Sequence, residues 1–347
     1  MGLPPLPDGR KWGLLVVNFI LTILGAAAPF LLRLYFLRGG RSLWLSSLVQ
    51  VGGWPLLLIP LAVSFLRRGP GGGGATLMSF SFAATFAGIG VLIGVDSYMY
   101  AVSSSLLPAS TNSILSSTQL AFVAVFSFLI VRQRFTACST NAVVVLTLGA
   151  AVLAVQAPAG DRPAGESTSK YAVGFATSLG AAALYALTLP LTELMYRKFR
   201  EEVTYRMVVE VQLLVSALAS AVCIVGMLVN GDFQAVGREA RESEMGEAKF
   251  YVVLVGGAAA WQAFSLGLMG TVACSSSLFA SVVLALLLPV SEIAAVLLFH
   301  ERFDGRKGVA LALSLWGFAS FCYGELTLSH HLLPRTSSLL ELELPAP

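Results

Sequence analysis

The chain has 347 residues, of which 56% are hydrophobic and only 12% are charged. Soluble domains carry roughly 25% charged residues, so this composition excludes an ordinary soluble protein, and the apolar content excludes intrinsic disorder. The formal net charge of +3 is small, so it gives no indication of a nucleic-acid partner. We therefore expect an integral membrane protein that is embedded in the lipid bilayer.

Long apolar stretches follow one another along the whole chain. A helix needs roughly 20 apolar residues to cross a hydrocarbon core about 30 Å thick, and the sequence offers about ten such stretches. Because lipid offers no partners for backbone N–H and C=O groups, each stretch is predicted to be an α-helix. In chain order the predicted spans are residues 12–32, 43–66, 77–102, 106–131, 137–155, 171–194, 205–229, 250–272, 275–299 and 308–324.

A stretch rich in Pro, Gly, Ser and Thr at residues 157–170 is the predicted linker between two halves of the chain. The halves are residues 12–156 and 171–325, and the expected tails are residues 1–11 and 326–347. Since each half would hold five of the predicted spans, an odd number, the second half would enter the membrane from the opposite side.

Short motifs recur in the two halves. Ser103-Ser104-Ser105-Leu106 is echoed by Ser275-Ser276-Ser277-Leu278, and each motif is expected to open the fourth helix of its half. The predicted fold is therefore all-α, with ten transmembrane helices arranged as an inverted repeat of two five-helix halves. This architecture is typical of secondary transporters.

Apart from Arg206 at the mouth of its helix, the charged residues inside the predicted spans are acidic: Asp96, Glu193, Glu210 and Glu292. Such groups are costly in a bilayer and mark functional candidates. Since no Lys or Arg lies deep in a span, we expect a neutral or cationic substrate rather than a phosphate or sulfate ester. Asp96 and Glu193 lie near span ends and are expected at the interface. Glu210 and Glu292 lie deeper, where they could carry a coupled proton or, alternatively, hold two helices together.

Four side chains fall near the midpoints of their predicted spans: Trp54, Gln119, Trp261 and Gln262. Amides offer paired donors and acceptors to the edge of a heterocycle, and indoles offer a stacking face. The sequence therefore predicts a binding pocket at the bilayer midplane. The alternative for each single Gln is a hydrogen bond to a neighbouring helix.

Motifs of enzymes and metal sites are missing from the sequence. It contains no H-E-x-x-H or G-x-S-x-G motif, and its four cysteines show no C-x-x-C spacing. We expect no catalytic residue, no metal and no organic cofactor. A proton bound and released by Glu210 or Glu292 would couple such a transporter to the proton gradient.

Several motifs along nearly the whole chain resemble those of the plant purine permeases. They are Pro29-x-x-x-Arg33-Leu34-Tyr35-Phe36, Gln50-x-x-Gly53-Trp54-Pro55, Ser117-Thr118-Gln119, Leu189-Pro190-Leu191-Thr192-Glu193, Glu210-x-Gln212, Trp261-Gln262-x-Phe264, Leu288-Pro289-Val290-Ser291-Glu292 and Leu315-Trp316-Gly317-Phe318. The resemblance implies a drug/metabolite transporter fold and proton-coupled uptake of adenine, cytokinins and related heterocycles.

Together, these inferences predict a proton-linked purine or cytokinin permease. Its substrate would stack on Trp54 and Trp261 and bond Gln119 and Gln262, with Asn112 nearby. Two alternatives stay open: a transporter of cationic alkaloids or other small heterocycles with the same fold, and a membrane receptor that does not transport. The plasma membrane is the expected location, with the endoplasmic reticulum and the vacuole as alternatives, and the oligomeric state is left open.

Overall fold

A computed structural model gives the fold of the chain. It describes residues 9–66, 80–107, 112, 115–116, 118–132, 137–154, 168–198 and 205–287, together with 305, 308–309, 312–313, 315–320 and 323–324. Every regular element in these ranges is a helix, which confirms the predicted all-α class.

Six stretches in the described ranges are long and apolar enough to cross a membrane: Trp12–Leu37, Leu43–Val63, Ala83–Leu106, Ala172–Lys198, Tyr205–Asn230 and Glu247–Cys274. They match six of the predicted spans. Three shorter apolar helices, at Gln119–Val131, Ala137–Gly149 and Ser277–Leu287, lie where three further spans were predicted. The ten-helix inverted repeat stays a prediction.

Several of these stretches are broken into shorter elements. The helices are α1 (Gly9–Gly25), α2 (Ala28–Leu37), α3 (Leu43–Val51), η1 (Trp54–Leu57), α4 (Leu58–Leu66), α5 (Phe80–Leu106), α7 (Gln119–Phe126), η2 (Ser127–Val131), α8 (Ala137–Ala154), α9 (Thr168–Lys198), α10 (Tyr205–Asn230), α11 (Asp232–Glu242) and α12 (Glu247–Cys274). The pair Gly52-Gly53 ends α3 and leads into a 3₁₀ turn that starts with Trp54-Pro55.

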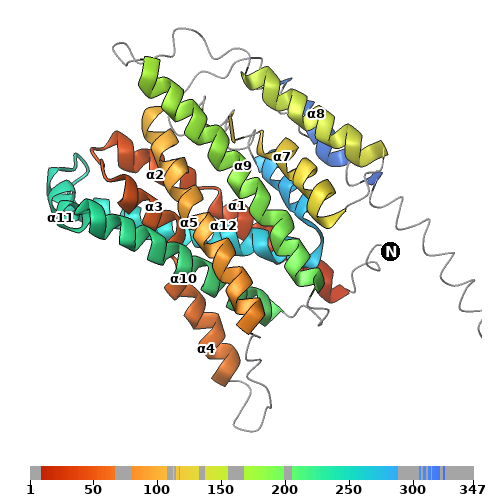
Figure 1. Cartoon of the computed structure of the whole chain (residues 1–347), viewed down its shortest axis with the longest axis horizontal. Coiled ribbons are helices and arrows are strands. Elements are labelled where there is room, and N and C mark those ends of the chain that lie inside the picture. The colour runs from red at the N-terminus through yellow and green to blue at the C-terminus, as the bar shows by residue number, and fades with distance from the viewer. Residues whose placement is uncertain are drawn as a thin grey trace, which may run out of the picture.

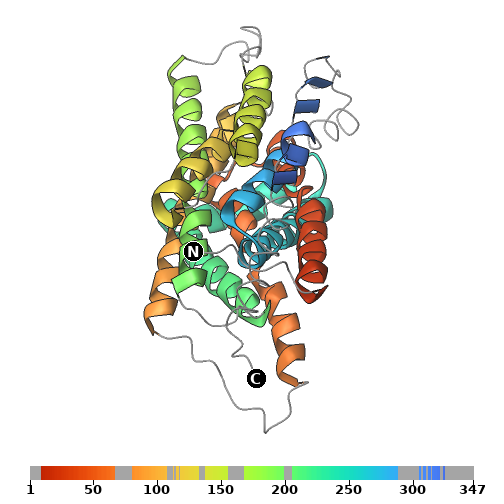
Figure 2. The ribbon, with the colours of Figure 1, turned by 90° about the vertical axis from the view of Figure 1, so that its right-hand side faces the viewer.

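The centre of the molecule is built by α5, which packs against α9, α10 and α3. In Figure 1, α5 and α9 run side by side, with α11 at one end of the molecule and α8 at the other. Turning the molecule shows α1 at one edge beside α12 (Figure 2), and the two helices are in extensive contact. The largest buried cluster joins α5, α9, α10 and α12 through Phe86, Ile89, Leu189, Val211 and Leu268.

Large apolar side chains also cover the outside of the bundle. Leu228, Val252 and Val255 are each at least 66% exposed. Such a surface would be unfavourable in water and fits contact with lipid tails.

The predicted boundary at Ser103-Ser104-Ser105 is wrong. These residues form the last turn of α5 rather than the start of another helix. Ser103 and Ser105 donate hydrogen bonds to backbone oxygens three residues earlier, at distances of 2.9 and 2.8 Å. Hydroxyl groups satisfied in this way let a helix continue. The second motif behaves as predicted, because α12 ends at Cys274 and a new helix opens at Ser277.

Candidate functional site

A central cavity of about 180 Å³ lies among α3, α5, α7, α9, α12 and the helix Ser277–Leu287. Both predicted halves of the chain therefore contribute to its walls. Its polar lining consists of Gln50, Asp96, Ser97, Tyr100, Ser116, Gln119, Tyr185, Trp261, Ser265 and Ser281. No Lys, Arg or His is among the lining residues that the structure describes. A cavity of about 150 Å³ already holds a benzene ring, so this one is suited to a small planar heterocycle.

Asp96 is the acidic residue of the cavity lining. It lies near the middle of the span Ala83–Leu106, and only 8% of its surface is exposed. One carboxyl oxygen, Oδ1, is buried without a hydrogen-bond partner in the described part of the chain. The prediction placed Asp96 near the end of a span that stops at residue 102, whereas α5 continues to Leu106, so Asp96 lies nearer the middle of its helix than predicted.

Two predicted site residues, Gln119 and Trp261, do line this cavity. Gln119 is the first residue of α7, and Trp261 lies in α12. The Gln119 Nε2 and the Trp261 Nε1 are both buried without a partner among the described residues. The indole is held edge-on by Tyr100 and Phe264, with ring centroids 6.0 and 5.7 Å away. Such packing fixes a ring without consuming its N–H group.

Gln50 lines the cavity, although it was not among the residues selected at the midpoints of the predicted spans. It lies one turn before Trp54 in α3 and is 7% exposed. Its Nε2 donates to the backbone oxygen of Ser97 at 3.1 Å, which ties α3 to α5 beside Asp96. Gln50 belongs to the family motif Gln50-x-x-Gly53-Trp54, which could have identified it from the sequence. Selecting residues by their depth in the predicted span picked Trp54 instead.

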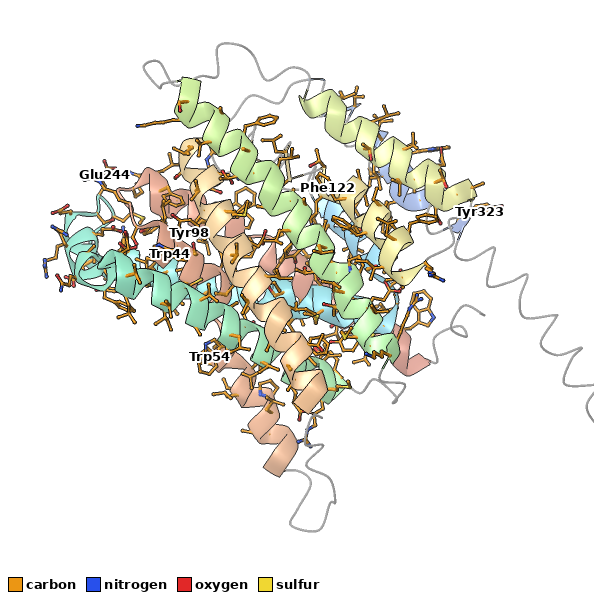
Figure 3. The ribbon with its side chains drawn as sticks, viewed as in Figure 1. Trp44, Trp54, Tyr98, Phe122, Glu244 and Tyr323 are labelled. Carbon is orange, nitrogen blue, oxygen red and sulfur yellow. The ribbon has the colours of Figure 1, made fainter. Side chains whose placement is uncertain are left out.

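Two other predicted residues, Trp54 and Gln262, are outside the cavity lining. The break at Gly52-Gly53 redirects the chain, and Figure 3 shows Trp54 beside α10 and α4. Gln262 is buried and lies where α12 packs against Gly53. The approach is close, since a Cβ added to Gly53 would lie 2.6 Å from the Gln262 Cβ. Neighbouring helix residues face different sides, so Trp261 and Gln262 cannot both point into one pocket.

Asn112 is buried and fully used in a hydrogen-bond network. Its Oδ1 accepts hydrogen bonds from Ser103 and Ser178 at 3.0 and 2.8 Å, and its Nδ2 donates to Ser104 at 3.0 Å. It is not part of the cavity lining. This network joins the end of α5 to α9, so the geometry indicates a structural role for Asn112.

Of the two predicted proton-coupling residues, Glu210 is not among the residues that line the cavity. Glu210 is half-buried in α10 and forms an ion pair with Arg206 at 2.7 Å. Glu292 lies outside the described residues. Glu193 was expected at the interface but is 3% exposed, and it accepts a hydrogen bond from the Ser277 backbone N–H at 2.7 Å. Its other oxygen pairs with Arg197.

Comparisons with known proteins agree with this architecture. A family model described as purine nucleobase transmembrane transport matches residues 13–330. Purine permease 3 of Arabidopsis thaliana is 42% identical, with 90% of this chain and 91% of the relative covered. Purine permease 2 of the same plant is 40% identical, with 91% and 92% covered.

A solved crystal structure, 16% identical, superposes with a TM-score of 0.54 over 92% of this chain and 98% of its own. At this identity, the superposition shows a shared fold and nothing about the substrate. The family match covers most of the chain, and the relatives are named as permeases rather than enzymes. The chain therefore belongs to the purine permease family of membrane transporters.

Proposed function

We propose that the chain is a secondary transporter that takes up purine nucleobases and derivatives such as cytokinins, driven by the proton gradient. The observation that supports this most is the chemistry of the central cavity. Amide, carboxyl and indole groups surround a space suited to a small planar ring, and no described lining residue is cationic. A purine presents donors and acceptors on its edge and an apolar face, which such a site can bind.

The binding roles follow from the position of each side chain. Trp261 and its neighbour Phe264 provide aromatic surface, while Gln119 provides an unpartnered amide N–H for a ring nitrogen. Base stacking on an aromatic side chain contributes about 1–3 kcal/mol, and a bidentate amide contact to adenine contributes a similar amount of discrimination. Together these interactions contribute about 2–6 kcal/mol, less than the roughly 8 kcal/mol of a micromolar Kd, so other lining contacts must add to the affinity.

Proton coupling requires a carboxyl group that can gain and lose a proton during the cycle. Glu210 and Glu292 were proposed from the sequence, but Glu210 is held by Arg206 outside the cavity. Asp96 meets the requirement better, since it lines the cavity and has an unpartnered oxygen. A buried carboxyl group without a cation nearby is costly in its charged form.

The test is uptake of radiolabelled adenine and trans-zeatin by yeast cells that lack their own purine transporters. We expect saturable uptake that is strongest at acidic external pH and is abolished by a protonophore. A fluorescent C-terminal tag confirms that the protein reaches the cell surface. Surface-expressed protein without adenine or zeatin uptake would contradict the proposal.

A second candidate substrate class is a cationic alkaloid. The acidic Asp96 in a cavity whose described lining lacks cations favours it. Direct uptake separates the two: labelled adenine should enter the cells if purines are the substrates, whereas a labelled cationic alkaloid should enter, and adenine should not, if alkaloids are. We propose the plasma membrane as the location, which imaging of the tagged protein in plant cells tests directly.

A further inference from the structure

Three residues that line the same small cavity, each on a different helix, carry a buried polar atom that has no hydrogen-bond partner in the described part of the chain. The three atoms are the Asp96 Oδ1 on α5, the Gln119 Nε2 on α7 and the Trp261 Nε1 on α12. Buried polar atoms in proteins almost always have partners, and each exception calls for an explanation. Eight buried side-chain atoms lack a partner among the described residues, and three of them belong to side chains that line this one cavity. A molecule bound there is placed to supply their hydrogen bonds once these side chains turn toward it.

The hydrogen-bond types define what that molecule must present. Gln119 Nε2 and Trp261 Nε1 are two unpartnered donor atoms that together carry three N–H bonds, so the molecule needs at least two acceptors. Asp96 needs a donor when it is ionised; when protonated, its carboxyl offers one O–H donor beside one acceptor oxygen. The edge of a 6-aminopurine, with an N–H next to a basic ring nitrogen, complements this carboxyl group in both states.

We propose that Asp96 binds the amino edge of a 6-aminopurine and exchanges the coupled proton with it in the same pair of hydrogen bonds, an inference that rests on the proposed function. When the proton is on the Asp96 carboxyl group, Asp96 and the purine are both neutral. With the proton on the ring nitrogen, a carboxylate faces a cation. The net charge of the pair is zero in both cases, so neither arrangement leaves an uncompensated charge in the membrane interior.

The described residues around Asp96 include few other groups that could exchange a proton with a ligand in the cavity. Tyr100 on the same helix and Tyr185 on α9 lie within electrostatic range of Asp96. Helix α10 contributes Cys223, which packs in a separate cluster with Val51 and Ala219. From α3 comes the amide Gln50, which does not titrate. No Lys, Arg or His among the described lining residues competes for the carboxyl group.

The decisive variant is Asp96→Asn. An amide keeps one donor and one acceptor and pairs well with the amino edge of adenine, but it cannot release a proton. The full-length protein in proteoliposomes is assayed for adenine exchange at equal pH, for adenine accumulation driven by a pH gradient, and for proton entry with a trapped pH-sensitive dye. Asp96→Ala removes both hydrogen bonds, and Glu244→Gln at the exposed Arg38–Glu244 pair is the matched control.

We expect Asp96→Asn to exchange adenine with a KM within about fivefold of the wild type, while proton entry and accumulation are lost. Asp96→Ala should raise the exchange KM at least about tenfold. Glu244→Gln should behave as the wild type in all three assays. Proton-driven accumulation by Asp96→Asn at the wild-type level would overturn the inference, and so would adenine exchange by Asp96→Ala with the wild-type KM.

An analogue series on the wild type tests the same contact without a variant that could misfold. N6-Methyladenine and N6-benzyladenine each keep one N–H at the amino edge, whereas N6,N6-dimethyladenine has none. We expect the dimethyl compound to compete with adenine at least about tenfold more weakly than the bulkier benzyl compound. Equal competition would overturn the inference alone, whereas a wild type that neither binds nor moves adenine would overturn the proposed function with it.

Discussion

The polar side chains of the cavity are positioned by their neighbours rather than by hydrogen bonds among themselves. Gln50 is tied to the Ser97 backbone, and Trp261 is packed edge-on against Tyr100 and Phe264. These contacts leave the Trp261 Nε1 without a hydrogen-bond partner among the described residues. Fixing a ring before the ligand arrives lowers the entropy lost on binding.

Two substitutions at Trp261 separate its ring from its N–H group. Trp261→Phe keeps an aromatic face but loses one hydrogen bond of about 0.5–1.5 kcal/mol, so the KM for adenine uptake should rise roughly two- to tenfold. Trp261→Ala also loses the stacking surface and should raise the KM at least about tenfold beyond that.

The measurement is the concentration dependence of adenine uptake in yeast, normalised to the amount of protein at the cell surface. Trp316→Ala is the control, since Trp316 is 67% exposed and lies outside the cavity. If both Trp261 variants kept the wild-type KM, the assignment of this indole to the substrate site would fall.

Two residues that lie elsewhere than predicted, Trp54 and Asp96, are close to the ends or breaks of helices. Trp54 was placed at the centre of one straight span, but Gly52-Gly53 ends α3 there and redirects the chain. Asp96 was placed near a span end because Ser103-Ser104-Ser105 was interpreted as a break. The depth of a residue in the membrane can be predicted from the length of its apolar stretch. The direction of its side chain depends on local helix breaks, which the apolar pattern does not reveal.

At the scale of helices, α9 contacts both serine motifs of the predicted repeat. Ser178 of α9 bonds Asn112, which in turn holds Ser103 and Ser104 at the end of α5. Glu193 of the same helix accepts the Ser277 N–H at the start of the next apolar helix. The spans themselves could be predicted from the lengths of the apolar stretches. These hydrogen bonds could not, because they join residues far apart in the chain.

The pairing of α1 with α12 depends on a close backbone approach. A Cβ added to Gly267 of α12 would lie 2.8 Å from the Thr22 backbone nitrogen and 2.5 Å from the Asn18 backbone oxygen. Small residues at such contacts let transmembrane helices pack closely. We expect Gly267→Ala to destabilise the protein by about 1–3 kcal/mol, because backbone atoms must move apart.

Gly256→Ala is the matched control in the same helix. Its added Cβ would meet nothing closer than 3.9 Å, and Ala is the better helix former, so its melting temperature should equal or slightly exceed that of the wild type. Both values come from thermal unfolding in detergent, followed by tryptophan fluorescence. Equal melting temperatures for the two variants would contradict a tight α1–α12 contact.

At the scale of the whole molecule, one end is closed by contacts between distant parts of the chain. The Tyr35 hydroxyl donates to Glu239, and the Ser42 hydroxyl donates to Asp232, both at 2.7 Å. These bonds connect the α2–α3 connection to α11. Arg38 and Glu244 pair at the surface beside them, at 3.3 Å. Alternating access moves one part of a transporter against the other around a fixed site, so contacts of this kind must break for this end to open.

Cross-linking tests whether this end opens during transport. In the double variant Arg38→Cys/Glu244→Cys, a short thiol-reactive cross-linker should reduce adenine uptake by at least about fivefold, because the α2–α3 connection and α11 could no longer separate. The exposed ion pair contributes at most about 1 kcal/mol, so the untreated variant should transport nearly as well as the wild type. The controls are each single variant and the wild type, treated with the same cross-linker. They show the effect of modifying cysteines without forming a cross-link, including the half-buried native Cys138 and Cys274. Full uptake by protein that is shown to be cross-linked would mean that the α11 end stays closed throughout the cycle, and that both openings of the cavity must be sought elsewhere.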